Sequence, residues 1–168
     1  MYKKGVLFMR RYVLSVLVEN VSGVLSRISG LITRRGFNID SLTVAQTEDA
    51  SVSRMTIVIH CDESVIEQVR KQLEKQIDVR EVIELKAHES VTREHVMVKI
   101  HAEPAQRVSV ISMAGVFRAN VVDVGEKSMI VELTGESSKV EAFIEIVKPL
   151  GLVEVVRSGI TGLTRGSK

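Results

Sequence analysis

The sequence predicts an α+β protein made of two βαββαβ units, each an antiparallel four-stranded sheet with two helices on one face. Two observations support this fold class. Apolar runs of strand type alternate with stretches in which apolar residues recur at helical spacing. The same order of elements also occurs twice, starting at Tyr12 and again at His95. We therefore expect two small domains, residues 10–86 and residues 87–168.

The first half opens with a strand, YVLSVLVE, and continues after a short loop into a helix. One apolar stripe defines this helix and consists of Val24, Leu25, Ile28, Leu31 and Ile32. Gly36 predicts its end. Two strands follow, FNIDSLTVAQT and SVSRMTIVIH, of which the first is expected at the edge of the sheet. Asp62 is expected to cap a second helix, and DVREVIEL gives the fourth strand.

The second half follows a predicted linker over residues 86–94. HVMVKIHA is its first strand, and Pro104 suits the first turn of the helix that follows. We expect this helix to bury Val108, Ile111 and Val116. ANVVDVG and SMIVELTG form a strand pair, a helix with an apolar stripe comes next, and LVEVVRS closes the unit. Both halves thus read as ferredoxin-like units.

Composition argues against several classes of protein. The net charge of +2 predicts no strong field for nucleic acid or acidic membranes. Aromatic residues make up 4% of the chain, and the third strand of each half has none, so bases would find no stacking platform. No apolar run reaches the ~20 residues of a membrane span, and the N-terminal stretch does not resemble a signal peptide. With a single cysteine, a cytoplasmic protein is expected.

No group of residues in the sequence has the pattern of a catalytic or metal site. Cys61, near the end of a strand, is expected to be inert. His95 and His101 share a strand face but are about 20 Å apart along it, too far to bind one ion. His88 has no second ligand at metal-binding spacing. We expect no catalytic residue, no metal and no cofactor on this chain.

The loop between the first strand and the first helix, ENVSG, offers two interpretations. Its free amides could hold a small carboxylate at the helix N-terminus, with Asn20 recognising an amino acid and Gly23 allowing close approach. Alternatively, Ser22 simply caps the helix and Gly23 relieves a tight corner. The corresponding loop of the second half, AEPAQ, has a proline and no glycine. Only the first half is therefore expected to bind such a ligand.

A second stretch, RRGFNIDSL, leads into the predicted edge strand. Asn38 and Asp40 lie there among apolar residues. An exposed apolar edge favours pairing with another copy of the chain. Asn38 of one chain would then approach the Asn20–Gly23 loop of the other, and a ligand would bind between two subunits.

Four segments together carry a resemblance to a known family: NVSGVLSR, RGFNI, SRMT and the closing VEVVRSGITGLTRG. They resemble the small, regulatory subunit of acetolactate synthase (acetohydroxyacid synthase). The likeness extends from about Arg10 to Gly166. It implies an N-terminal ACT domain, an effector-binding and dimerisation module, followed by an ACT-like domain that activates and docks to the catalytic subunit.

The resemblance further implies a non-catalytic subunit whose partner, the large catalytic subunit, uses thiamine diphosphate, Mg²⁺ and FAD. Feedback inhibition by valine or a related branched-chain amino acid is expected. The effector positions carried over from the family are Asn20, Val21, Ser22, Gly23, Val24, Leu25, Asn38 and Ile39, with Ser26 and Ala45 at the regulatory periphery. A homodimer through the ACT domain is implied. The alternative is a free-standing ACT-domain sensor of amino acids that acts on another enzyme or regulator.

Overall fold

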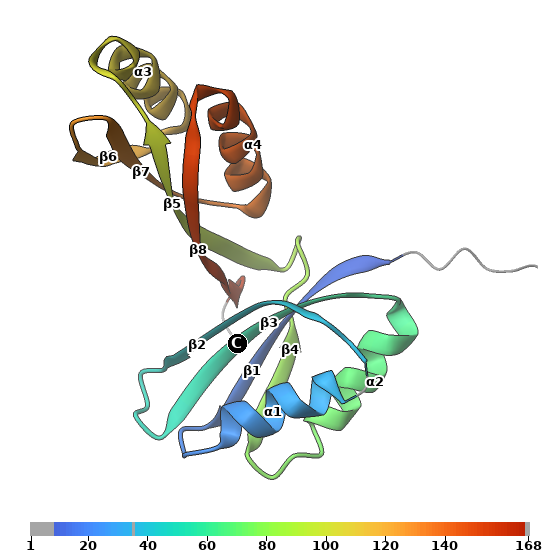
Figure 1. The fold of residues 1–168 in the computed structure, drawn as a ribbon. Coiled ribbons are helices and arrows are strands. Elements are labelled where there is room, and N and C mark those ends of the chain that lie inside the picture. The colour runs from blue at the N-terminus through green and yellow to red at the C-terminus, as the bar shows by residue number, and fades with distance from the viewer. Residues whose placement is uncertain (1–8, 35, 167–168) are drawn as a thin grey trace, which may run out of the picture. The chain divides into compact units, whose positions relative to one another are not determined.

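The computed structural model describes residues 9–34 and 36–166. Its first sheet contains four strands: β1 (Arg10–Glu19), β2 (Ile39–Gln46), β3 (Val52–Cys61) and β4 (Val79–Glu84). They pair antiparallel in the order β2-β3-β1-β4, so β2 is an edge strand as predicted. The helices α1 (Val24–Thr33) and α2 (Glu63–Leu73) cover one face of this sheet (Figure 1).

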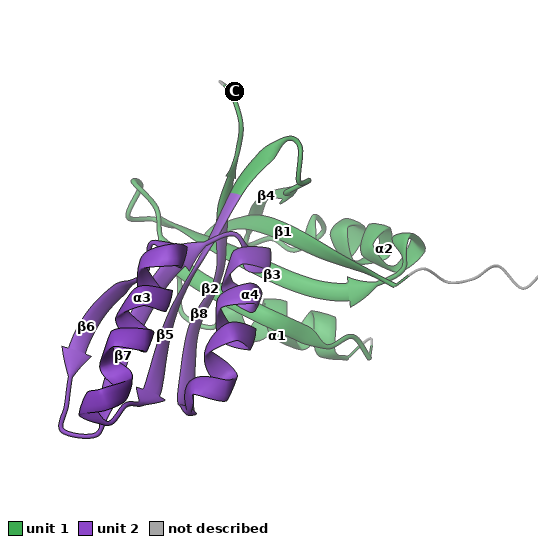
Figure 2. Ribbon diagram, turned by 90° about the horizontal axis from the view of Figure 1, so that it is seen from above, with its two compact units in different colours: residues 1–91, 162–168 green, residues 92–161 purple. Residues whose placement is uncertain are grey.

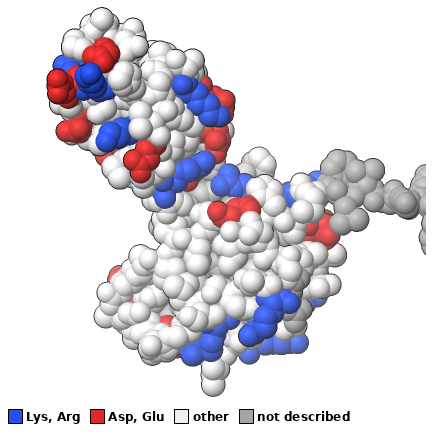
Figure 3. Space-filling model, in the orientation of Figure 1, with Lys and Arg blue, Asp and Glu red and all other residues white. Residues whose placement is uncertain are grey.

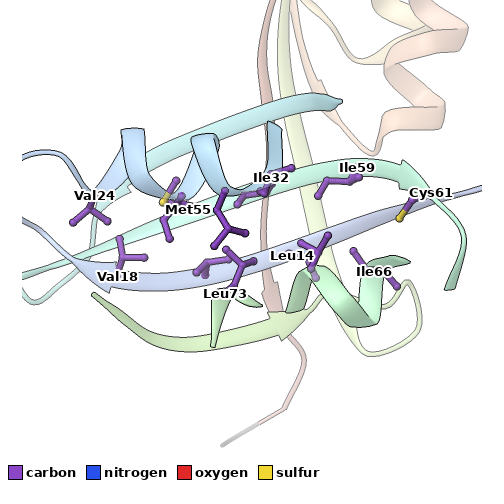
Figure 4. Close-up of a cluster of buried hydrophobic side chains, with 14 residues drawn as sticks. Leu14, Val18, Val24, Ile32, Met55, Ile59, Cys61, Ile66 and Leu73 are labelled. Atoms are coloured by element: carbon purple, nitrogen blue, oxygen red, sulfur yellow. The ribbon is translucent and has the colours of Figure 1, made fainter. Parts of the chain in front are cut away.

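The core of the first unit lies between this sheet and its two helices. Alternate residues of β1, Leu14, Val16 and Val18, are buried there, as period-two alternation requires. Figure 4 shows Val18, Val24 and Met55 close together at the end of the core beneath the start of α1. The loop that precedes α1 is therefore anchored on its inner side by Val24.

The second sheet contains β5 (Ser90–His101), β6 (Asn120–Val124), β7 (Ser128–Gly135) and β8 (Leu152–Thr164), in the order β6-β7-β5-β8. Its helices are α3 (Arg107–Phe117) and α4 (Ser137–Val147), each flanked by a 3-10 turn, η1 (Pro104–Gln106) and η2 (Lys148–Leu150). The two βαββαβ units confirm the predicted fold class.

Two boundaries of the second half differ from the prediction. Residues 90–94, predicted as linker, already belong to β5, and β8 continues to Thr164 rather than ending near Ser158. The two extensions support each other: the Arg165 amide donates to the Glu89 carbonyl at 2.7 Å, and its Nε donates to the Ser90 carbonyl at 3.1 Å. Because the start of β5 and the end of β8 are far apart in sequence, the local sequence pattern did not reveal that they pair.

The buried face of α3 was predicted wrongly. Val108, Ile111 and Val116 are 72%, 53% and 79% exposed, whereas Val110 and Ala114 are buried. The core side of α3 also includes Phe117, whose ring lies 5.3 Å from that of Phe143 on α4. Nearly every residue of α3 is apolar or small, so spacing alone does not distinguish its two sides. An apolar surface formed by Val108, Ile111 and Val116, the α3 face, is left exposed.

The chain divides into two compact units within strands β5 and β8 (Figure 2). The second unit spans Thr92–Thr161. The first contains the preceding residues up to Val91 and also the chain from Gly162 onward. No helix of the described residues is long and apolar enough to cross a membrane.

Candidate functional site

Gly23 ends the loop between β1 and α1 in a conformation that favours glycine. Its φ is +85° and its ψ −9°, so it lies in the left-handed region. It is the N-cap residue of α1, and no side chain caps this helix. Ser22 therefore does not cap α1, contrary to the alternative interpretation of the sequence. The start of the helix is left open.

The amides at this helix start include free donors. The Val24 amide reaches the Val21 carbonyl only at 3.4 Å, while the Arg27 amide donates to the Gly23 carbonyl at 3.0 Å. Within the described part of the chain, the amides of Leu25 and Ser26 have no acceptor. Such unpaired N–H groups, with the positive end of the helix dipole, favour an anion. Val21 and Leu25 add exposed apolar side chains beside these donors.

Asn20 holds the loop against the hairpin between β2 and β3. Its amide Nδ2 donates to the Ala50 carbonyl at 2.9 Å, and its Oδ1 accepts from the Ser53 hydroxyl at 3.0 Å. Its backbone amide donates to the Ser51 carbonyl at 2.7 Å. Both ends of the side-chain amide thus have protein partners, although each can form one further hydrogen bond. In this structure Asn20 fixes the position of the loop.

The equivalent helix start in the second unit is closed. A capping box joins Glu103 and Gln106, and the Glu103 amide donates to the Gln106 side-chain oxygen at 3.0 Å. Pro104 occupies the first turn. The two units therefore differ at this helix start: free amides, which favour an anion, are present in the first unit, whereas the helix start of the second unit is capped. The comparison of their loop sequences predicts this difference.

Asn38 and Ile39 lie far from this loop within one chain. The loop follows Glu19, which pairs with Val52, whereas Ile39 pairs with Ile59 at the other end of β3. Seven residues of strand separate these positions, about 23 Å. Asn38 is exposed, and its Nδ2 donates to Asp40 Oδ1 at 3.4 Å.

The opposite end of β2 lies beside the loop. Ala45 is exposed and Gln46 pairs with Ser53. The Gln46 side chain donates to the Ala50 carbonyl at 2.9 Å, the same oxygen that accepts from Asn20. Of the predicted site residues, the stretch 20–26 and Ala45 are therefore gathered at one end of the sheet, and Asn38 and Ile39 lie at the other. Val24 is buried, so only its backbone faces the loop surface.

Arginines neutralise the carboxylates next to the loop. Arg27 of α1 pairs with Asp78 at 2.7 Å, and Arg80 of β4 donates to the two oxygens of Glu19 at 2.6 and 2.9 Å. The hydrogen bond from Arg80 lowers the pKa of Glu19. Figure 3 shows Lys and Arg side chains gathered along the lower edge of the first unit, where Figure 1 places α1. An approaching anion thus meets cations and paired carboxylates.

The described residues contain no group of three or more His, Cys, Asp and Glu side chains that could hold a metal ion. Cys61 is buried, and this burial raises the pKa of its thiol, which disfavours the reactive thiolate. His95 lies against Glu132, with 3.2 Å between Nε2 and Oε2, in a pair that is open to solvent.

Comparison with known sequences assigns the family. A family profile described as an AHAS small subunit-like ACT domain matches residues 14–81, and one described as the small subunit of acetolactate synthase matches residues 93–166. The acetolactate synthase small subunit of Mycobacterium leprae is 47% identical over 94% of this chain and 93% of its own length. The chain belongs to the acetolactate synthase small-subunit family.

Other members of this family agree in length and fold. The small subunit of Bacillus subtilis is 45% identical over 93% of this chain and 91% of its own. A probable small subunit from Archaeoglobus fulgidus is 46% identical, covering 94% and 99%. The crystal structure of the Thermotoga maritima small subunit superposes with a TM-score of 0.86 at 34% identity, covering 95% of this chain and 99% of that one. The predicted family is therefore confirmed.

Sequence reasoning missed three residues that shape the loop: Ala50 and Ser53, which hold Asn20, and Arg27, whose guanidinium lies beside Gly23. Arg27 is part of the quoted NVSGVLSR segment, so a signal for it was present. The hairpin contacts of Asn20 join residues 30 and 33 positions apart, and only the folded chain reveals them.

Proposed function

We propose that this chain is the non-catalytic regulatory subunit of a cytoplasmic acetolactate synthase and that it binds valine or a related branched-chain amino acid between two copies of its ACT domain. The thiamine diphosphate, Mg²⁺ and FAD of the reaction would be held by the large catalytic subunit. The first unit senses the amino acid, and the second, with its exposed α3 face, docks to the catalytic subunit and activates it. Membership of the small-subunit family supports this assignment.

The separation of Asn38 from the open loop is the observation on which the site depends. Within one chain these parts lie at opposite ends of β2. If β2 pairs antiparallel with β2 of a second chain, the start of one strand lies beside the end of the other. Asn38 of one subunit then approaches the Asn20–Gly23 loop of its partner. Two such sites form, related by the two-fold axis.

The chemistry of the two parts matches the two ends of an amino acid. The free amides of Leu25 and Ser26 suit the carboxylate. The Asn38 oxygen of the second subunit suits the ammonium group, since its amide nitrogen is directed to Asp40. Exposed Val21 and Leu25 offer apolar contact to a branched side chain. A ligand that needs both chains stabilises one arrangement of the dimer, and couplings of this kind are about 1–3 kcal/mol.

Substitution of Gly23 by Asp tests the proposal. The new carboxylate would occupy the place of the ligand's carboxylate, so valine affinity measured by calorimetry should fall by more than about 100-fold. The matched control is Gly166→Asp, because Gly166 also has a positive φ, so both variants place an aspartate in the left-handed region. Activation of the catalytic subunit should persist in both variants. Wild-type protein that does not bind valine, or parallel loss of activation and binding in Gly23→Asp, would contradict the proposal.

A further inference from the structure

The guanidinium of Arg27 is directed at the open loop by a fixed ion pair. Its Nε and Nη2 atoms both contact Asp78 Oδ2, at 2.8 and 2.7 Å. The third nitrogen, Nη1, lies only 3.1 Å from the point that a Cβ atom on Gly23 would occupy. One edge of the guanidinium thus binds Asp78, and the remaining nitrogen lies beside the loop.

Asp78 is itself held in place. It directly precedes β4, its carbonyl accepts a hydrogen bond from the Glu19 amide at 2.8 Å, and its side chain is largely shielded from solvent. The ion pair therefore connects α1 to the end of β1 where the loop begins. This restricts the long Arg27 side chain, which would otherwise lose rotamer freedom on binding a ligand.

Nη1 has no hydrogen-bond acceptor among the described residues. The other carboxylate next to the loop, Glu19, is bound by Arg80 and does not compete for it. A guanidinium with a free edge beside unpaired backbone amides is suited to a carboxylate, because its hydrogen bonds are charge-assisted.

We propose that Arg27 is the residue that selects for the α-carboxylate of the effector, through Nη1, while Asp78 holds it in position. This inference rests on the proposed function, since it names the recognition group of the same site. It also gives Gly23 a second role: a Cβ atom there would lie 3.1 Å from Arg27 Nη1, so the guanidinium would have to shift by a few tenths of an ångström. A ligand without a carboxylate would lose the contribution of this residue.

Calorimetry with valine and with valinamide, whose carboxylate is replaced by a neutral amide, tests the inference. Arg27→Gln should weaken valine binding by about 10- to 100-fold, as expected for loss of a hydrogen bond to a charged group. It should leave valinamide binding unchanged. Arg70→Gln, at a half-buried arginine of α2, is the matched control and should bind both ligands as the wild type does.

Asp78→Asn separates ligand recognition from a purely structural role. This variant breaks the same ion pair but keeps the guanidinium. Only the restraint on the Arg27 side chain is lost, so valine affinity should fall by about 3- to 10-fold, less than in Arg27→Gln. If Arg27→Gln and Asp78→Asn lose valine affinity equally, Arg27 only supports the fold and the inference is wrong. If wild type binds valine and Arg27→Gln binds it equally well, the inference fails while the proposed function stands. Wild type that binds no valine overturns both.

Discussion

Arg157 binds the buried carboxylate of Glu94 with two hydrogen bonds, from Nε at 2.8 Å and from Nη2 at 2.7 Å. Glu94 on β5 is only 4% exposed, and its partner extends from the neighbouring strand β8. The remaining nitrogen, Nη1, donates to Glu141 on α4 at 2.6 Å. Hydrogen bonding to Glu94 raises the pKa of Arg157, so the guanidinium stays protonated. One arginine therefore joins three elements of the second unit.

Removing this arginine should destabilise the protein strongly. Arg157→Leu leaves the Glu94 carboxylate buried without a partner, and we expect the free energy of unfolding in urea to fall by about 3–5 kcal/mol. Glu141→Gln is the control, because it removes only the exposed partner and should cost about 1 kcal/mol or less. If the two variants lower the free energy of unfolding equally, the buried ion pair contributes no more to stability than the exposed one.

The ion pair between Glu19 and Arg80 predicts a pH dependence of stability. The pKa of Glu19 is lower in the folded chain than in the unfolded one, chiefly because Arg80 donates to it. The contribution of this ion pair to the free energy of unfolding is therefore present above the pKa of Glu19 in the unfolded chain, about 4.3. It is lost as the pH falls through the pKa of Glu19 in the folded chain. The melting temperature of Arg80→Gln should be below that of wild type at pH 7, and the two should converge toward pH 3. A difference in melting temperature that stays constant between pH 7 and pH 3 would contradict this role of the ion pair.

The edge of β2 predicts a dimer that valine strengthens. Val44 is exposed on this strand, and Val44→Lys places like charges along a two-fold interface. Sedimentation velocity should show the dimer dissociation constant rising by about 10-fold or more. Valine should lower that constant in the wild type, because a ligand that binds only the dimer stabilises it by mass action.

The matched control for this substitution is Val124→Lys, an exposed valine on the edge strand β6 of the other sheet. It should leave the dimer intact. A Val44→Lys protein that dimerises and binds valine like wild type would exclude β2 as the interface.

The proposed docking of the catalytic subunit on the α3 face predicts the effect of a substitution there. Val116 is 79% exposed, so Val116→Asp should change the stability of the chain by no more than about 0.5 kcal/mol. When the variant is titrated into the catalytic subunit, the concentration of variant needed for half-maximal activation should be higher than that of the wild type by about 10-fold or more. Valine binding should be unchanged. The control is Val153→Asp, at an exposed valine of β8, which should activate as the wild type does. If Val116→Asp activates the catalytic subunit at the same concentrations as the wild type, the α3 face is not the docking site.

Much of the fold follows from local pattern. The alternation of Leu14, Val16 and Val18 identifies a core-facing strand, and Asp62 caps α2 by accepting from the Val65 amide, as predicted. The repeat of βαββαβ order and the contrast between ENVSG and AEPAQ are also properties of the sequence. These features depend on neighbours a few residues apart, which is why they are readable without the structure.

Other features were decided only by tertiary structure. The buried side of α3 depends on which face meets Phe143, because both sides are apolar. Asn20 remains a predicted ligand-binding residue, and only the structure shows that its side chain also holds the loop to a hairpin that lies 30 positions further along the chain. Asn38 and Gly23 are close in sequence but lie at opposite ends of the sheet, because α1 runs back along the sheet between them.

The sequence by itself thus determined the order of the elements, the contrast between the ENVSG and AEPAQ loops and the family of this protein. The tertiary structure alone decided how Asp78 directs the Arg27 guanidinium beside Gly23, since that contact joins residues 51 positions apart. Local patterns record the periodicity of a single element, whereas a binding site is formed by side chains from several elements that only folding brings together.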